Sequence, residues 1–226
     1  PASTAENRWQ CFHGFGHVVM METNYDLMRA LDVCDSIRNA RERDGCGFGV
    51  FMENVLAGHF RKDAHTDWVK PDDPFYPCTV VAEHYQDPCY RRAPTLLFRY
   101  TTQDPKAALT TCMGLVDHSN RVSCLKGMAR ELAERFNGEP AQVADWCWAI
   151  REPYRKICFA ETIPYIMSTP ARAVAAASVC PLIAQEYGPE CAAWVSTRVR
   201  LFAPGEQFSI CRATGNSEAA CNQYRP

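Results

Sequence analysis

Apolar and polar residues are mixed along the chain in short segments that are bounded by Ser, Thr or Pro, and this arrangement predicts short helices. Residues 24–34 (NYDLMRALDVC) follow Thr23, a candidate N-cap. Pro105 and Pro140 stand near the starts of two similar segments. Proline is tolerated in the first helical turn because the N–H group that it lacks has no helical partner there.

A second set of segments, each beginning near a cysteine, is also predicted to be helical. Residues 124–136 (CLKGMARELAERF) and 191–202 (CAAWVSTRVRLF) are examples. The polar stretches 118–123 and 186–190 that precede them are predicted to be loops. The pattern predicts an all-α protein in which helices follow one another in pairs.

The 13 cysteines follow the same arrangement. Twelve form pairs separated by 10 to 12 residues: Cys34 and Cys46, Cys78 and Cys89, Cys112 and Cys124, Cys147 and Cys158, Cys180 and Cys191, and Cys211 and Cys221. The second members follow one another at steps of 43, 35, 34, 33 and 30 residues, near the period of helix-turn-helix repeats. Cys11 lies 35 residues before Cys46 and is left over, as the second cysteine of a first repeat would be.

The predicted fold is an array of about six αα-hairpins, solenoid-like, in which a disulfide ties the end of one helix to the start of the next. Each bond closes a short loop and would contribute roughly 2–3 kcal/mol to stability. Residues 1–226 are expected to form a single elongated domain. Residues 55–77 are predicted to be a loop insertion, and residues 204–226 a C-terminal cap or tail rather than two helices.

Composition limits the classes of partner and compartment. The chain is 47% hydrophobic and 22% charged with a net charge of -2, so it has no excess of basic residues for nucleic acid. No apolar run approaches the roughly 18 residues of a transmembrane helix. Thirteen cysteines favour an oxidising, extracytoplasmic compartment, either periplasmic or secreted. The opening PASTAENRW is expected of a mature chain without its signal peptide, and a trimmed chain would look the same.

In its period, helix pairs and intra-repeat cysteines, the chain resembles the cysteine-rich Sel1-like and tetratricopeptide-like αα-repeat proteins. The resemblance covers most of the chain in spacing rather than in consensus residues. It implies an extracytoplasmic right-handed stack with a concave face, which could bind another protein subunit or a glycan. It implies no chemistry.

The stretch CFHGFGH, residues 11–17, combines a repeated feature with an unrepeated one. Gly14, Gly49 and Gly127 each lie three residues after a second cysteine. A glycine inside a helix costs about 1 kcal/mol relative to alanine. We therefore expect these glycines to allow the close approach of a neighbouring backbone.

His13 and His17 have no counterpart in the other repeats. Their i, i+4 spacing puts both imidazoles on one helix face, the geometry of helical metal sites. Glu53, seven residues after Cys46, could complete a two-His-one-carboxylate set that suits zinc, iron or manganese. A thiolate at Cys11 with the two histidines would instead suit copper. The alternatives are that the histidines are ordinary helix residues and that Cys11 is linked to another chain or to a cysteine lost in processing.

Other motifs add little. His59 and His65, with Trp68 nearby, are weaker candidates in the insertion. The chain contains no P-loop, Rossmann fingerprint, HExxH or GxSxG motif, so a nucleotide cofactor is not indicated.

Two functions remain at this point. The first is a periplasmic or secreted metal-binding protein, either a carrier or a metalloenzyme in which Glu53 is the candidate acid or base. The second is a non-catalytic repeat scaffold that binds a protein or a glycan. Whether the protein is an enzyme is left open.

Overall fold

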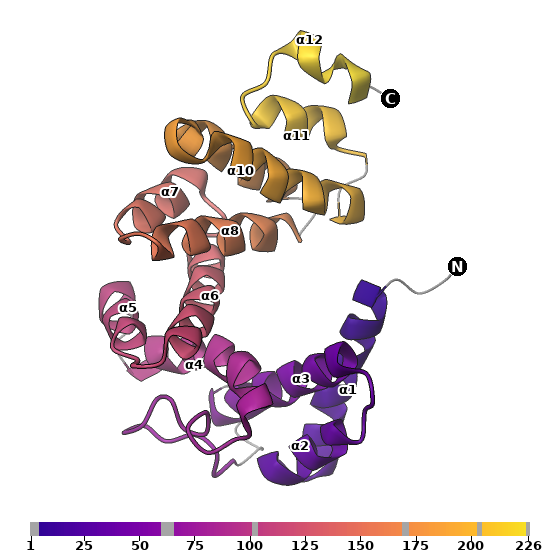
Figure 1. The fold of residues 1–226 in the computed structure, drawn as a ribbon, viewed down its shortest axis with the longest axis vertical. Coiled ribbons are helices and arrows are strands. Elements are labelled where there is room, and N and C mark those ends of the chain that lie inside the picture. The colour runs from indigo at the N-terminus through magenta and orange to yellow at the C-terminus, as the bar shows by residue number, and fades with distance from the viewer. Residues whose placement is uncertain (1–4, 60–65, 101–103, 169–171, 203–204, 225–226) are drawn as a thin grey trace. The chain divides into compact units, whose positions relative to one another are not determined.

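The computed structural model describes residues 5–59, 66–100, 104–168, 172–202 and 205–224, and most of them are helical (Figure 1). The α-helices are α1 (Ala5–Glu22), α2 (Leu27–Asp35), α3 (Ala40–His59), α4 (Gln86–Tyr100), α5 (Pro105–Met113), α6 (His118–Arg135), α7 (Pro140–Trp148), α8 (Tyr154–Met167), α9 (Ala173–Ala177), α10 (Val179–Phe202), α11 (Gln207–Ala213) and α12 (Glu218–Cys221), with 3-10 turns η1 (Glu83–Tyr85) and η3 (Asn222–Tyr224). The described residues contain no β-strand, only an isolated bridge between Lys70 and Asp73. The predicted all-α class is confirmed.

Six disulfides join the pairs of cysteines that the spacing predicts. They are Cys34–Cys46, Cys78–Cys89, Cys112–Cys124, Cys147–Cys158, Cys180–Cys191 and Cys211–Cys221, with Cα atoms 5.4 to 5.7 Å apart. Most of the bonds tie the end of one helix to the next, while Cys78 lies in an irregular segment before α4. Among the described residues, Cys11 is the one cysteine outside a disulfide, and it is exposed.

Helices that carry a second cysteine begin earlier than predicted. Residues 118–123 form the first turns of α6 rather than a loop, so that prediction was wrong. The reason is a cap further upstream, where Asp117 Oδ1 accepts a hydrogen bond from the backbone N–H of Asn120 at 2.8 Å. In the same way Asn39 Oδ1 accepts from the N–H of Arg41 at 3.0 Å at the start of α3.

Two further boundaries differ from the prediction. The N-cap of α2 is Asp26, whose side chain accepts from the N–H of Arg29, while Thr23 donates to carbonyl oxygens at the end of α1. The predicted loop at 186–190 is reduced to a sharp kink at Tyr187 (φ -127°, ψ 21°), where α10 divides into two helices. The Cys180–Cys191 disulfide spans this kink, with Cα atoms 5.6 Å apart.

The insertion and the C-terminal segment contain more helix than predicted. Helix α3 continues to His59, so the first residues of the 55–77 insertion are helical. Asn54 of α3 donates a hydrogen bond at 3.0 Å to the carbonyl of Trp68, which lies farther along in the insertion. This bond attaches the insertion to α3. The segment 204–226 contains two short helices, and Ser217 caps the second by accepting from the N–H of Ala220 at 3.3 Å.

The chain divides into two compact units, residues 1–127 and 128–226, with the boundary inside α6. In the first unit the core gathers apolar side chains of α1, α2 and α3 around the Cys34–Cys46 disulfide, and Leu27, Leu31 and Val50 are at most 3% exposed. The prediction of one elongated domain stays a prediction.

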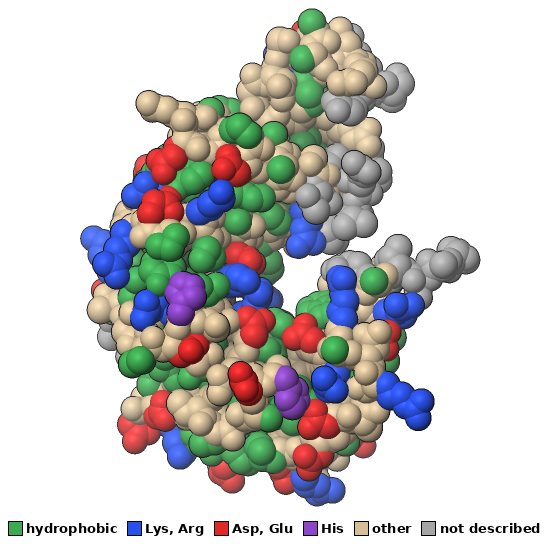
Figure 2. Space-filling model, in the orientation of Figure 1, with side chains coloured by type: hydrophobic (Ala, Val, Ile, Leu, Met, Phe, Trp, Pro, Cys, Tyr) green, Lys and Arg blue, Asp and Glu red, His purple; other side chains and the backbone are tan. Residues whose placement is uncertain are grey.

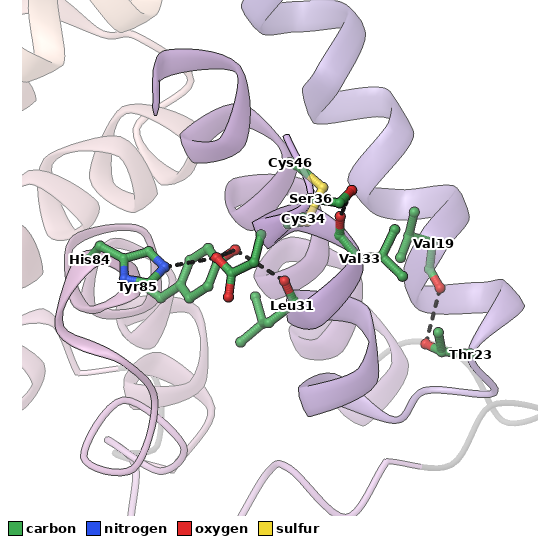
Figure 3. Close-up of a disulfide and its surroundings, with 10 residues drawn as sticks. Val19, Thr23, Leu31, Val33, Cys34, Ser36, Cys46, His84 and Tyr85 are labelled. Atoms are coloured by element: carbon green, nitrogen blue, oxygen red, sulfur yellow. Dashed lines mark hydrogen bonds and ion pairs between the residues drawn. A yellow bond between two sulfur atoms is a disulfide. The ribbon is translucent and has the colours of Figure 1, made fainter. Parts of the chain in front are cut away.

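The irregular segment around Cys78 is attached to α2 by a polar cluster (Figure 3). The Tyr85 hydroxyl donates to Asp35 Oδ1 at 2.9 Å and lies 3.1 Å from the carbonyl of Leu31, and His84 Nε2 lies 3.0 Å from Asp35. Burial raises the pKa of Tyr85, and its hydrogen bond to Asp35 acts in the same direction. The cluster therefore fixes the insertion-bearing repeat against the first disulfide.

The surface shows no separation of charge on the face drawn in Figure 2, where acidic and basic side chains are interspersed. This mixing matches the net charge of -2. Within the described parts of the chain, no helix has both the length and the apolar character that crossing a bilayer would require.

Helices α1 and α3 run in parallel with their backbones in direct contact. A Cβ atom on Gly49 would lie 2.0 Å from the carbonyl oxygen of His13, and one on Gly16 would lie 2.1 Å from that of Cys46. No real side chain tolerates such distances, so both positions require glycine. The expected close approach is confirmed at Gly49 and also at Gly127, but a Cβ on Gly14 would meet nothing within 4 Å.

This difference gives a matched pair of substitutions. Gly49→Ala should lower the free energy of unfolding by about 1–3 kcal/mol, because the added methyl group forces α1 and α3 apart. Gly14→Ala should raise it by up to about 1 kcal/mol, because alanine favours a helix and nothing opposes its side chain. Urea unfolding of both variants measures the two changes, and equal effects of the two substitutions would contradict the contact.

Candidate functional site

The N-terminal helix α1 places three aromatic side chains in a row. Trp9, His13 and His17 recur every four residues, and the ring centroids are 5.3 Å apart for Trp9 and His13 and 5.0 Å apart for His13 and His17. The prediction that the two histidines share a helix face is confirmed. The row lies on the side of α1 that packs against α3, because Gly16 and the backbone of His13 are in contact with that helix.

Glu53 reaches the row from α3. Its Oε2 atom lies 2.8 Å from Nδ1 of His17, and the Glu53 side chain is 2% exposed. The hydroxyl of Tyr25, in the turn between α1 and α2, lies 3.5 Å from the other carboxylate oxygen, which is a long contact. The buried carboxylate is therefore approached by an imidazole and a phenol from different parts of the first unit.

The glycine contact explains why Glu53 and His17 meet. His17 lies four residues after His13, and Glu53 lies four residues after Gly49, whose Cα is held against the His13 carbonyl. In parallel helices, one further turn along each chain brings the next side chains together. A wider separation of the helices would place the carboxylate out of reach of the imidazole.

The hydrogen bond also orients the imidazole of His17. A carboxylate oxygen can only accept, so Nδ1 carries the hydrogen in this pair and Nε2 of a neutral ring presents its lone pair. The side chain of His17 is 23% exposed, so part of the ring can be reached from solvent. The Nε2 atom of His13 is buried.

The structure brings together three of the four predicted site residues. His17 is bonded to Glu53, and His13 lies beside His17. Cys11 is exposed and lies two residues from His13, about 200° around the helix, so it does not join them. Within the described residues, no group of three or more His, Cys, Asp or Glu side chains is arranged to hold a metal ion.

Of the weaker candidates His59, His65 and Trp68, the structure describes the side chain of Trp68 alone. The side chain of His59 and the whole of His65 lie outside the described residues. Trp68 stacks on Tyr76 with ring centroids 5.8 Å apart, within the insertion.

Sequence reasoning missed Trp9 and Asp44. The indole Nε1–H of Trp9 donates to Asp44 Oδ2 at 3.1 Å, which fixes the first ring of the row against α3. Burial raises the pKa of Asp44, and the hydrogen bond from Trp9 only partly offsets this effect. The signal for Trp9 is its position four residues before His13, whereas Asp44 shows no such spacing in the sequence.

Comparison of the chain with protein families, with curated proteins and with solved structures finds no match. The resemblance to Sel1-like and tetratricopeptide-like repeats therefore stays a prediction. The function has to be argued from the geometry of the site.

The raised pKa of Asp44 predicts a pH dependence of stability. Because the folded-state pKa lies above the unfolded value of 3.8, the stabilisation from protonation is full below 3.8 and is lost as pH rises through the folded pKa. Asp44→Asn should therefore be more stable than the wild type at pH 7, and this difference should shrink as the pH falls toward 3.8.

Urea unfolding of both proteins between pH 4 and pH 7 measures this difference. Asp32→Asn, which removes an exposed carboxylate of α2, is the matched control for charge. The explanation fails if the two variants show the same change with pH.

Proposed function

We propose that the protein binds a transition metal ion outside the cytoplasm, in the periplasm or after secretion, through His13 and His17 with Glu53 as the residue that orients His17. Six disulfides support an oxidising compartment. The observation that carries the metal proposal is the 2.8 Å hydrogen bond between Nδ1 of His17 and the buried Glu53.

This hydrogen bond is typical of histidine ligands in metalloproteins. A ligating histidine usually donates its other ring N–H to a carboxylate or carbonyl, which fixes the tautomer and makes the ligating nitrogen more basic. Glu53 provides this carboxylate for His17, and its side chain is only 2% exposed. In this arrangement Glu53 supports the ligand, whereas the sequence alone suggested it as a ligand or as an acid or base.

His13 is the natural second ligand because it lies one helical turn before His17, with ring centroids 5.0 Å apart. Imidazole suits zinc, copper and iron. With two protein ligands, the ion would keep open coordination positions for water or a substrate atom. This openness is compatible with a metal carrier and with a metalloenzyme, in which the bound ion would activate water.

The other candidate function is a non-catalytic interaction scaffold. It is supported by exposed apolar side chains on α1, where Phe15 is 41% and Val18 is 48% exposed. Such side chains on a helix favour contact with another protein rather than with a glycan, whose hydroxyl groups need polar partners. This function does not exclude metal binding, since the histidines lie on the opposite side of α1.

Metal binding is tested by titrating the protein with zinc and with copper and by elemental analysis of the dialysed complex. We expect about one ion per chain and loss of binding in His17→Ala. Glu53→Gln should weaken binding by about 10–100-fold, the usual effect of removing such a supporting carboxylate.

Two controls separate this effect from general changes of charge. Glu22→Gln removes an exposed carboxylate at the end of α1, and His118→Ala removes an exposed histidine of α6. Neither should change the affinity. The proposal is wrong if the wild type takes up no metal, or if His17→Ala binds it as tightly.

A further inference from the structure

The row of side chains that contains the two histidines has one more member at the next turn of α1. Met21 follows His17 by four residues, as His17 follows His13, and all three lie within α1 (Ala5–Glu22). Four residues turn an α-helix through about 400°, so each member lies one turn farther along and about 40° farther round than the one before. Met21 is therefore a neighbour of His17 on the same side of the helix, as His13 is in the preceding turn.

The row moves gradually away from the contact with α3. The Nε2 atom of His13 is buried, the side chain of His17 is 23% exposed, and Met21 is 38% exposed. The adjacent Met20 is fully buried in the core of the first unit, together with residues of α2 and α3. Of these two methionines, Met21 is thus the one that an incoming ion can reach.

The direction of side chains on a helix brings the Met21 thioether toward His17. Long side chains lean toward the N-terminus of a helix and cover the turn before their own Cα atom. The Cβ atoms of residues four apart are about 5–6 Å from one another, and methionine has three rotatable bonds with which to adjust its sulfur. Nδ1 of His17 is bonded to Glu53, so Nε2 is the nitrogen with which His17 would share an ion with Met21.

The donors on this row indicate which ion fits. Imidazole nitrogens bind zinc, iron and copper, whereas a thioether sulfur selects Cu(I). Zinc sites in proteins use three or four protein ligands, drawn from His, Cys, Asp and Glu. Across the part of the chain that the structure describes, no three such residues are arranged to hold an ion. Two imidazoles and one thioether therefore suit Cu(I) better than zinc.

The charge of Glu53 favours the same ion. Its side chain is 2% exposed and bonded to His17, so a negative charge lies close to any ion that His17 binds. A monovalent ion would balance this charge, whereas a divalent ion would leave an excess of positive charge in a partly buried site. Charge without a partner is costly away from water.

We propose that the ion bound at this site is Cu(I) and that Met21 is its third ligand, beside His13 and His17. This inference rests on the proposed metal-binding function and adds to it the identity of the ion and one ligand. Met21 would occupy one of the coordination positions that the two histidines leave open. A donor set of nitrogen and sulfur favours Cu(I) over Cu(II), which prefers tetragonal sites of nitrogen and oxygen.

The test compares the affinities of variants for Cu(I) and for zinc in a Cys11→Ser background, because the exposed Cys11 thiol would itself bind Cu(I). Cu(I) is maintained with ascorbate in the absence of oxygen, and the chromophoric chelator bicinchoninate competes with the protein for it. Met21→Leu should weaken Cu(I) binding by about ten-fold or more, since it removes a ligand rather than a supporting residue. It should leave the affinity for zinc unchanged.

Met28→Leu is the matched control, because Met28 of α2 is 39% exposed and Met21 is 38% exposed. It should change neither affinity. Met21→His should raise the affinity for zinc, because it supplies a third imidazole. X-ray absorption at the copper edge should show a sulfur neighbour in the Cys11→Ser protein that is lost when Met21→Leu is added. Circular dichroism and a disulfide map with the six internal bonds establish that each variant is folded.

Three results would overturn this inference while the proposed function stands, in a protein that binds zinc or copper through His17. They are a Cu(I) affinity that Met21→Leu and Met28→Leu change equally, a copper site without a sulfur neighbour, and a zinc affinity that Met21→His does not raise. A protein that takes up neither zinc nor copper would overturn the inference and the proposed function together.

Discussion

The backbone contact between α1 and α3 is the constraint on which the first unit and its site depend. Two glycines, Gly16 and Gly49, let the helices approach until a Cβ on either would overlap a carbonyl oxygen. This approach sets the register in which Glu53 meets His17 at 2.8 Å. The cost of two helical glycines, about 1 kcal/mol each, is offset by the packing that they permit. Single residues of the sequence, Gly16 and Gly49, thus decide how closely α1 and α3 pack.

The disulfides constrain the chain within each helix pair rather than between pairs. Each closes a loop of 10 to 12 residues, so it reduces the freedom of the unfolded chain at one helix pair without deciding how successive pairs pack. Packing between pairs depends on the faces of the helices that follow the second cysteines. In α1 one face holds the histidines against α3, while Cys11, Phe15 and Val18 on another face are exposed.

The helix pairs and disulfides could be predicted because they depend on short-range spacing, which the sequence displays directly. Helix starts were predicted less well, since caps such as Asp117 lie upstream of the cysteines and compete with other polar residues nearby. A helical wheel is enough to predict that His17 and Glu53 can meet. The contacts that Tyr25 and Asp44 make with the site could not be predicted. They depend on the path of the chain between helices and on burial, and the spacing of residues in the sequence encodes neither. Gly14 shows the limit of a repeat argument, since it shares the spacing of Gly49 and Gly127 but a Cβ there would meet nothing within 4 Å.

The central claim is that the α1–α3 contact holds His17 in the Nδ1–H form against Glu53, with Nε2 available to a ligand. Nitrogen-15 NMR of the imidazole side chains in the metal-free protein tests it most directly, because the two ring nitrogens of each tautomer have distinct shifts. We predict that the His17 ring is in the Nδ1–H form in the wild type. In Glu53→Gln, we expect the ring to change tautomer or its Nδ1 proton to exchange faster with solvent. An Nε2–H form in the wild type, unaffected by the Glu53 substitution, would contradict the account.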